Sequence, residues 1–259
     1  MQSAPKREPS FAEQVGGWTQ DGLREIRTLA LLLSESLYHS TLGLRKPKTL
    51  LPGATALQMM RLGSGALPIV LMLSALIGFT LAMQSGFQLQ KYGALIFLAD
   101  GVGMSMVMEI GPVMTAVILA GRSGSAITAE IATMVVQEEV AALRSMAINP
   151  VHYLVLPRFW ALSVTQPLLT VASCLAGILS GLAVGVLFFQ LSPSNFMDEL
   201  QQAIPMRYVW QGVIKSVTFA YLITTVSSYH GYHTNGGALE VGKSSTDAVV
   251  YSSILILVF

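Results

Sequence analysis

The sequence is poor in charge and contains almost no cysteine. Only 11% of its 259 residues are Asp, Glu, Lys or Arg, about half the share that is usual in a soluble domain. The single cysteine, Cys174, lies in an apolar run, so no disulfide framework can form. The net charge of +1 gives no indication of a nucleic-acid partner. These shortages argue against a soluble, disulfide-bonded or nucleic-acid-binding protein.

Groups that do chemistry are also scarce. No Ser, His and Asp arrangement suggests a nucleophile, and no carboxylate pair suggests general acid–base catalysis. His230 and His233 have a spacing that could hold a metal on one helix face, but no third ligand is near in sequence. We therefore expect no catalytic residue, no metal and no cofactor in this chain. The N-terminus also lacks the charged and apolar regions of a cleaved signal peptide.

Long apolar segments are what the sequence has instead. Its mean hydropathy is +0.60, and a bilayer core about 30 Å thick needs about 20 apolar residues in a helix. Four segments meet this with few or no charges, and a fifth begins near Thr246: 62–90, 94–121, 159–197, 216–239 and 248–259. The sequence predicts an all-α membrane protein with five transmembrane helices.

The chain divides into a polar tail over 1–20, interfacial or elbow helices over 21–60, and a five-span domain over 61–259. Apolar residues from Leu23 to Leu37 recur at three and four, which predicts a helix lying on the membrane surface. A soluble helix docked on a partner is the alternative. Twelve of the Lys and Arg residues outside the spans lie on one predicted side, and only Lys91 and Arg207 lie on the other. The positive-inside rule therefore places the N-terminus in the cytoplasm.

Two short amphipathic helices are predicted between the spans. The first covers about 137–147 and has Glu138 and Glu139 at its start, where acidic residues suit the helix dipole. Its apolar residues Val140, Leu143 and Met146 recur at three, which indicates a partner groove; an ordinary solvated loop is the alternative. Such a cytoplasmic helix is typical of a transporter subunit. The second covers about 193–203 on the outer side, with Ser192 and Pro193 as its start signal.

Charged and small residues inside the spans are further candidates. Glu109 lies inside the second span, and Lys215 lies early in the fourth, which we place at about Tyr208 to Tyr229. Both therefore fall at membrane depth, where ionisable groups are expensive and usually functional. Snorkelling to a membrane face is the alternative for both. Small residues recur at every fourth position in the first and third spans, and they predict close helix packing within one subunit or across a dimer: Ser74, Gly78, Ala82, Gly86, Gly177, Gly181 and Gly185.

Two other segments need interpretation. Residues 237–244 match the phosphate-loop pattern G-x-x-x-x-G-K-[ST], but that loop needs a strand before it and a parallel sheet around it. We interpret the match as chance, in a flexible cytoplasmic turn. Residues 81–92 mix leucines with Gln84, Gln88 and Gln90, and an unpaired amide in hydrocarbon costs a few kcal/mol. These glutamines indicate a cavity with some water, or an end of the span that lies in the outer interface.

Several of these pieces together resemble the MlaE/YrbE permease family, the membrane subunits of lipid-transporting ABC systems in bacterial envelopes. The match runs over nearly the whole chain from about Leu50, and these segments carry it: Glu109-Ile110-Gly111-Pro112, Ala120 to Ala126, Ala129-Glu130, Glu138 to Leu154, Leu156-Pro157-Arg158 and Ile214-Lys215-Ser216.

The resemblance implies a homodimer in the bacterial inner membrane that moves phospholipid. It also implies a cytoplasmic ABC ATPase that uses ATP and Mg²⁺, a periplasmic ring of MCE-domain proteins, and often a small STAS-domain protein. The family's residue roles carry over to three groups in this sequence. Lipid would contact Leu81, Gln84, Leu89 and Tyr92; Glu109 and Lys215 would be charges important for transport; and Glu138, Glu139, Leu143 and Met146 would couple the chain to the ATPase.

The chain departs from the family pattern at several positions. Met108 stands where an arginine commonly precedes the glutamate, so we expect Glu109 to lack that partner. Ala132 and Ala147 replace frequent glycines, and Ala141 and Asn149 replace frequent aspartates. Lys243 stands where arginine is usual, and the sequence stops at Phe259, before an acidic residue that the family's last span usually carries.

Three different functions stay open from the sequence. The cargo could be another apolar molecule, such as a sterol or a fatty acid. The chain could be a membrane scaffold that holds the MCE ring without transporting anything. It could also be an ion-coupled carrier that uses Glu109 and Lys215, although the internal repeats common in such carriers are not seen.

Overall fold

The computed structural model describes residues 52–259, and this part of the chain consists of helices joined by short turns, without a strand. The predicted all-α architecture is therefore confirmed for these residues. The predicted tail over 1–20 and most of the interfacial segment over 21–60 lie outside them. What the structure describes of that segment is helical: α2 and the start of η2, which lead through η3 into α3.

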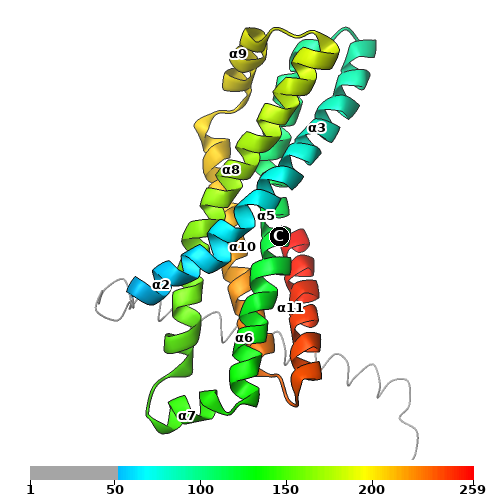
Figure 1. The fold of residues 1–259 in the computed structure, drawn as a ribbon. Coiled ribbons are helices and arrows are strands. Elements are labelled where there is room, and N and C mark those ends of the chain that lie inside the picture. Colours follow the sequence, from blue (N-terminus) through cyan, green and yellow to red (C-terminus); the bar gives the residue numbers. More distant parts are fainter. Residues whose placement is uncertain (1–51) are drawn as a thin grey trace, which may run out of the picture.

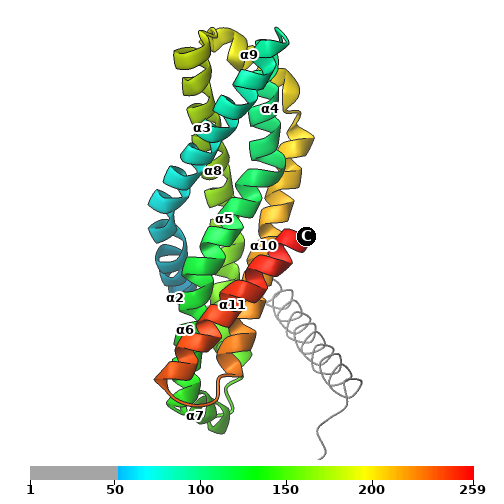
Figure 2. The same cartoon turned by 90° about the vertical axis from the view of Figure 1, so that its right-hand side faces the viewer.

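The elements form an elongated bundle (Figures 1 and 2). In chain order, the α-helices are α2 (Pro52–Gln58), α3 (Leu67–Lys91), α4 (Leu98–Ser105), α5 (Gly111–Leu119), α6 (Ser125–Val136), α7 (Glu139–Ser145), α8 (Leu156–Phe189), α9 (Pro193–Ala203), α10 (Met206–Tyr232) and α11 (Ala238–Val258). Short π or 3₁₀ segments join them: η2 (Met59–Gly63), η3 (Ser64–Ala66), η4 (Leu95–Phe97), η5 (Met106–Ile110), η6 (Ala120–Gly124) and η7 (Val151–Val155).

Within the described residues, four helical ranges are long and apolar enough to cross a bilayer: Thr55–Lys91, Leu95–Val136, Val151–Phe189 and Ala238–Val258. A fifth long helix, α10, has 27 residues but is richer in polar side chains. It packs against α5, α6, α8 and α11. The range Leu95–Val136 has 42 residues, which corresponds to about 63 Å of helix. That is about twice the thickness of a bilayer core.

The small residues of the first span pack against α8. Ser74, Gly78, Ala82 and Gly86 are all buried, and the Ser74 hydroxyl lies 2.6 Å from that of Ser173. One turn further along both helices, a Cβ on Gly78 would lie 2.1 Å from the carbonyl oxygen of Gly177. The predicted close packing is confirmed here, and it lies within one subunit. Only residues without bulky side chains allow two backbones to approach this far.

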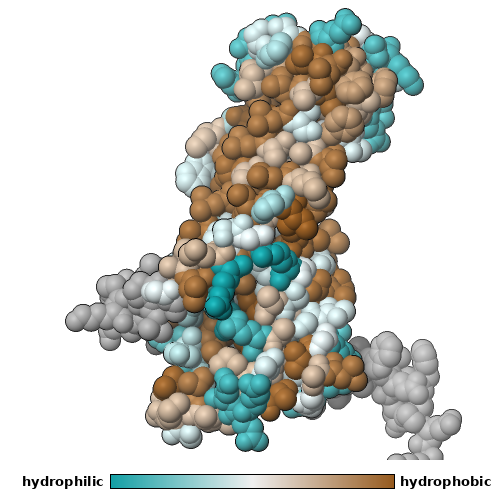
Figure 3. All heavy atoms as spheres, in the orientation of Figure 1, coloured by the Kyte–Doolittle hydropathy of each residue, from teal (hydrophilic) through white to brown (hydrophobic). Residues whose placement is uncertain are grey.

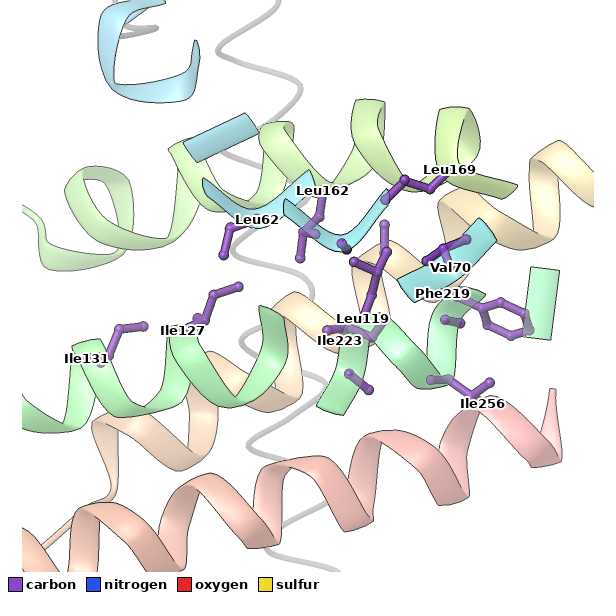
Figure 4. Packing of buried hydrophobic residues seen from close by; sticks show 14 residues of the cluster. Leu62, Val70, Leu119, Ile127, Ile131, Leu162, Leu169, Phe219, Ile223 and Ile256 are labelled. Atoms are coloured by element: carbon purple, nitrogen blue, oxygen red, sulfur yellow. The ribbon is translucent and has the colours of Figure 1, made fainter. Parts of the chain in front are cut away.

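The largest apolar core joins six α-helices, α3 among them through Val70 (Figure 4). Leu119 of α5, Ile127 of α6, Leu162 of α8 and Ile223 of α10 are buried together, and Ile256 brings α11 into the cluster. A smaller cluster lies toward the α9 end, where Leu98, Val102 and Met106 pack on Ala82 and Val184. These two clusters hold the long helices side by side.

The two ends of the molecule differ. Helix α9 lies at one end and the short α7 at the other (Figure 1). On the face in Figure 3, hydrophobic side chains cover much of the half that carries α9, and hydrophilic ones gather at the tip. The half that ends in α7 is more mixed in character. The predicted outer helix over 193–203 matches α9, and the predicted helix over 137–147 contains α7.

Candidate functional site

The structure joins Glu109 and Lys215 in an ion pair between η5 and α10. The Lys215 Nζ donates to Glu109 Oε2. The lysine side chain is 24% exposed and the glutamate 62%. Met108 leaves Glu109 without the arginine expected beside it, but Glu109 is paired all the same, with Lys215. The partner comes from a residue 106 positions away, which the neighbouring sequence could not reveal.

Local sequence explains why Glu109 lies on a π segment. Pro112 has no N–H, and its ring would collide with the carbonyl of Met108 in a regular α-helix. The chain widens instead, and the Gly111 N–H bonds to the carbonyl of Met106, five residues back. A Cβ on Gly111 would lie 2.5 Å from the Cys174 sulfur. Single π turns within α-helices are frequent at functional sites.

The pair lies deep along the predicted second span and beside an apolar groove. Glu109 is 13 residues from Arg122 and 14 from Leu95, about 20 Å of helix in each direction. A groove of about 230 Å³ adjoins it, lined by Ile110, Val113 and the end of α11. Pairing reduces the cost of placing two charges at this depth. The site thus combines a paired charge with an apolar surface.

A second ion pair lies in the half of the bundle that ends in α7. Arg158 is only 3% exposed, and its Nη2 lies 2.9 Å from Glu130 Oε2. Its Nη1 donates to the carbonyl of Leu154 at 2.6 Å. The pair joins α6 to the start of α8, the two helices that flank the α7 connection. The sequence does not pair these two residues, because they lie 28 positions apart on opposite sides of the α7 connection.

The connection that carries α7 has a residue with a left-handed backbone conformation at each end. Glu138 precedes the helix with φ 61°, and Ala147 follows it with φ 58°. At the second end, the Ile148 N–H bonds to the carbonyl of Leu143 and the Ala147 N–H to that of Arg144, both at 3.0 Å. This is a Schellman motif, in which the left-handed position usually holds glycine. It gives a physical reason for the frequent family glycine that Ala147 replaces.

The predicted coupling residues do not form one apolar stripe. Val140 is buried against its own chain. Leu143 is half-buried, and Glu138 and Glu139 are exposed. Met146 is 61% exposed. The exposed surface of α7 is therefore acidic at its start, while its end carries the basic Arg144 beside the apolar Met146.

The predicted lipid-contacting residues at the end of α3 divide between two surroundings. Leu81 and Leu89 pack against the smaller core cluster. Gln84 is exposed, and so is Tyr92, just beyond the helix. The structure of one subunit therefore does not bring these four side chains onto a single surface.

The phosphate-loop match lies mainly in a helix. Helix α11 starts at Ala238, so Gly242, Lys243 and Ser244 are helical and their N–H groups cannot surround a phosphate. The interpretation as a flexible turn is wrong for these residues, and the predicted start of this span near Thr246 lies about two turns too late. The Thr234 hydroxyl donates to that of Ser244 at 2.9 Å.

The histidine pair packs against tyrosines. The rings of His233 and Tyr229 lie 4.3 Å apart, and His230 stacks on Tyr251 at 5.1 Å. Over residues 52–259, no group of three or more His, Cys, Asp or Glu side chains is placed to hold a metal.

The family model for Permease MlaE matches residues 55–259. The chain belongs to the MlaE permease family. A probable ABC transporter permease protein of Rickettsia typhi is 37% identical over 201 residues, which cover 78% of each chain. The intermembrane phospholipid transport system permease protein MlaE of Haemophilus influenzae is 34% identical, over 77% of each chain. TRIGALACTOSYLDIACYLGLYCEROL 1 of Arabidopsis thaliana is 31% identical, over 79% of this chain and 58% of its own.

Membership in the MlaE family and the four apolar helical ranges identify an integral membrane protein. Its relatives are named as permeases of ABC transporters. The chain is therefore a transport subunit, and a permease of this type implies an ATPase partner.

Proposed function

We propose that this MlaE-family permease moves phospholipid between the bacterial inner membrane and a periplasmic MCE-domain carrier. A separate cytoplasmic ABC ATPase would supply the energy by hydrolysing ATP, with Mg²⁺ as its cofactor. The name of the Haemophilus influenzae relative, an intermembrane phospholipid transport protein, supports this cargo. A homodimer of the chain, with an associated STAS-domain protein in some systems, completes the proposed assembly.

One structural observation carries the proposal. The face of α3 opposite α8 is exposed and changes character along its length. Met72 and Leu76 are 58% and 56% exposed, and Thr80, Gln84 and Gln88 follow at steps of four and are also exposed. Residues at this spacing share a helix face. The face offers apolar contacts for acyl chains and then amides and a hydroxyl for a headgroup, in the order in which a phospholipid presents its own parts.

The membrane arrangement in this proposal includes α10 as the fifth span. Its buried face packs on α5, α6 and α8, and its Lys215 is paired with Glu109 at depth. The N-terminus and α7 would be cytoplasmic, and α9 would be periplasmic. The exposed Met146 and the acids Glu138 and Glu139 then face the ATPase.

The test is phospholipid transfer by the purified complex in liposomes, measured with a fluorescent phospholipid and the MCE-domain protein as partner. We expect transfer that requires ATP and is lost with a hydrolysis-deficient ATPase. A Gln84→Leu, Gln88→Leu variant should slow it, since the headgroup would lose its polar contacts. Binding of the ring without transfer would identify a scaffold.

Two controls distinguish this function from an ion-coupled carrier and from a transporter of a different cargo. Transfer driven by an ion gradient without ATP would identify an ion-coupled carrier. Mass spectrometry of the lipids that co-purify with the complex should find phospholipid. Enrichment of sterols or free fatty acids instead would replace the proposed cargo.

A further inference from the structure

The Glu130–Arg158 pair holds a positive charge almost out of water at the start of α8. The Arg158 side chain is 3% exposed, whereas that of Glu130 is 47% exposed. Within the described residues, the buried Arg158 Nε has no hydrogen-bond partner. A guanidinium withdrawn from water is costly unless it is paired and hydrogen-bonded. Glu130 is therefore the counter-charge on which the position of Arg158 depends.

Local sequence fixes this guanidinium to the backbone of α8. Pro157 has no N–H, and in a regular α-helix its ring would collide with a carbonyl one turn back. The chain widens into η7 instead, and the Leu156 N–H bonds to the carbonyl of Val151, five residues back. The Arg158 side chain runs back along this wider turn, where Nη1 donates to the carbonyl of Leu154 at 2.6 Å. Nη2 then reaches across to α6.

The pair bridges two helices that hardly pack on each other. Among the described helices, α6 packs mainly on α10 and α11, and α8 packs mainly on α3 and α10. Neither is a close packing partner of the other. The contact of 2.9 Å between Arg158 Nη2 and Glu130 Oε2 therefore joins α6 to α8 where backbone packing does not hold them together.

Short connections join α7 to both of these helices (Figure 1). Only Gln137 and Glu138 lie between α6 and α7. On the other side, residues 146–150 lead from α7 to η7, and the Val151 N–H bonds to Asn149 Oδ1 at 2.9 Å. A displacement of α7 therefore reaches α6 and α8 with little slack.

The two helices lead to different parts of the permease. Helix α6 continues through η6 into α5 and η5, which carries Glu109. Helix α8 packs along α3, where the hydroxyls of Ser74 and Ser173 lie 2.6 Å apart. An ion pair that joins α6 to α8 beside α7 makes both routes follow the same displacement.

We propose that Glu130 and Arg158 are positioning residues for coupling to the ATPase. Their ion pair holds α6 and the start of α8 together, so that a displacement of α7 moves both helices as one unit. Without the pair, the two helices separate, and ATP is hydrolysed with less transfer of lipid. This inference rests on the proposed function, in which α7 contacts the ATPase.

The first experiment measures the phospholipid transferred per ATP hydrolysed by the complete complex in liposomes. Arg158→Met removes the link at similar volume and leaves no buried charge unpaired, because Glu130 is half exposed. The complex should therefore assemble. Transfer per ATP should fall about tenfold, within the usual range of coupling between two sites. Arg158→Lys keeps the charge and should retain most of the transfer.

Two further variants separate the pair from a general effect of charge. Glu130→Gln should lower transfer per ATP at least as much as Arg158→Met, because it leaves Arg158 charged and buried. Glu240→Gln is the matched control for loss of a carboxylate. Glu240 lies in the first turn of α11 and takes part in neither ion pair of residues 52–259, so the ratio should not change.

A distance measurement tests the link without transport. Spin labels at positions 133 and 164 lie on exposed parts of α6 and α8. Cys174→Ala is the background, and each complex contains one labelled copy of the chain. Pulsed electron resonance should give one narrow distance with and without ATP while the pair is intact. In Arg158→Met, a longer distance should appear when ATP is added.

Two results would overturn the inference. An Arg158→Met complex that assembles and keeps the normal transfer per ATP would make the pair a structural contact only. Identical distance distributions with and without the pair would show that other contacts hold α6 to α8. If the unaltered complex transfers no lipid with ATP, the proposed function fails instead, and the distance measurement still decides whether the pair holds the helices together.

Discussion

The Glu109–Lys215 pair supports a prediction about single charged side chains. Lys215→Ala would leave Glu109 without its partner at membrane depth, and an unpaired charge at the bilayer centre costs about 2.5–3.5 kcal/mol. We expect lipid transfer to fall about tenfold or more, because about 1.4 kcal/mol already corresponds to tenfold. Transfer assays on the reconstituted complex measure this effect.

A double variant in which the two charges are swapped tests whether Glu109 and Lys215 act as a pair. Glu109→Lys combined with Lys215→Glu restores an ion pair with reversed polarity, and it should recover part of the transfer that either single change loses. Lys91→Ala, at the exposed end of α3, is the control for loss of a lysine. If the double variant is as inactive as the two single losses combined, the two side chains act separately.

Ala147 offers a second prediction. Its φ of 58° costs an alanine about 1–2 kcal/mol relative to glycine. Glycine also makes the unfolded chain more flexible, and this offsets part of the stability that the substitution would add. The Ile148 amide bonds to the carbonyl of Leu143. If Ala147→Gly adds about 1 kcal/mol of local stability, hydrogen–deuterium exchange of this amide should slow about fivefold. Hydrogen–deuterium exchange of the purified chain measures it.

The matched control for Ala147 is Ala142→Gly, inside α7. Glycine in a helix interior costs about 1 kcal/mol, so this change should speed exchange across α7. Faster exchange at Ile148 in the Ala147→Gly variant would contradict the proposed strain.

These residues also show what local sequence can predict. Glu109 and Lys215 are recognisable singly, because each is an ionisable group in an apolar segment. Their pairing depends on how η5 packs on α10 through Gly212, and no spacing rule encodes that contact. Arg158 and Glu130 are similar.

Among the elements, α7 supports a prediction about coupling. Leu143 is half-buried, so a charge there would disturb the permease itself. Met146 is 61% exposed, so a charge at this position should affect only contacts with a partner and not the fold of the permease. Met146→Asp should abolish co-purification of the ATPase, because an unpaired charge in an apolar contact costs a few kcal/mol. Membrane insertion of the permease should be unchanged.

The control for that prediction is Ala141→Asp. Ala141 is exposed on the same helix and stands where the family frequently has aspartate, so ATPase binding should persist. Retained binding and ATP hydrolysis with Met146→Asp would make this end of α7 a solvated surface.

The elements themselves are largely predictable. Long uncharged segments and the Ser192-Pro193 start signal give α3, α8 and α9 nearly at their observed bounds. The predicted start of α11 is wrong because Glu240, Lys243 and Asp247 suggest a loop. Charge shows that a segment is outside the hydrocarbon, but it does not stop a helix from continuing into water. The small-residue rows predict close packing, and only the fold shows that α8 is the partner of α3.

For the whole molecule, helix length leads to a topology prediction. The range Leu95–Val136 spans about 63 Å, and a bilayer core covers only about 30 Å of it. Arg122 lies about two thirds of the way along it, toward α7, and most of the basic residues of the chain lie on the α7 side of the predicted spans. The positive-inside rule then places α6 and α7 in or beyond the cytoplasmic interface.

Cysteine accessibility tests this placement, with Cys174→Ala as the background so that each variant has one thiol. An impermeant maleimide should label positions 133 and 139 only from the cytoplasmic side and position 195, in α9, only from outside. Met72→Cys, on the exposed apolar face of α3, should stay unlabelled, because a thiol in hydrocarbon is neither ionised nor accessible to the reagent. If position 133 is protected from labelling, the bilayer lies closer to α7 than we predict. The Glu109–Lys215 pair would then not be near the bilayer centre. Labelling of position 139 from outside would reverse the orientation, and α7 could no longer contact a cytoplasmic ATPase.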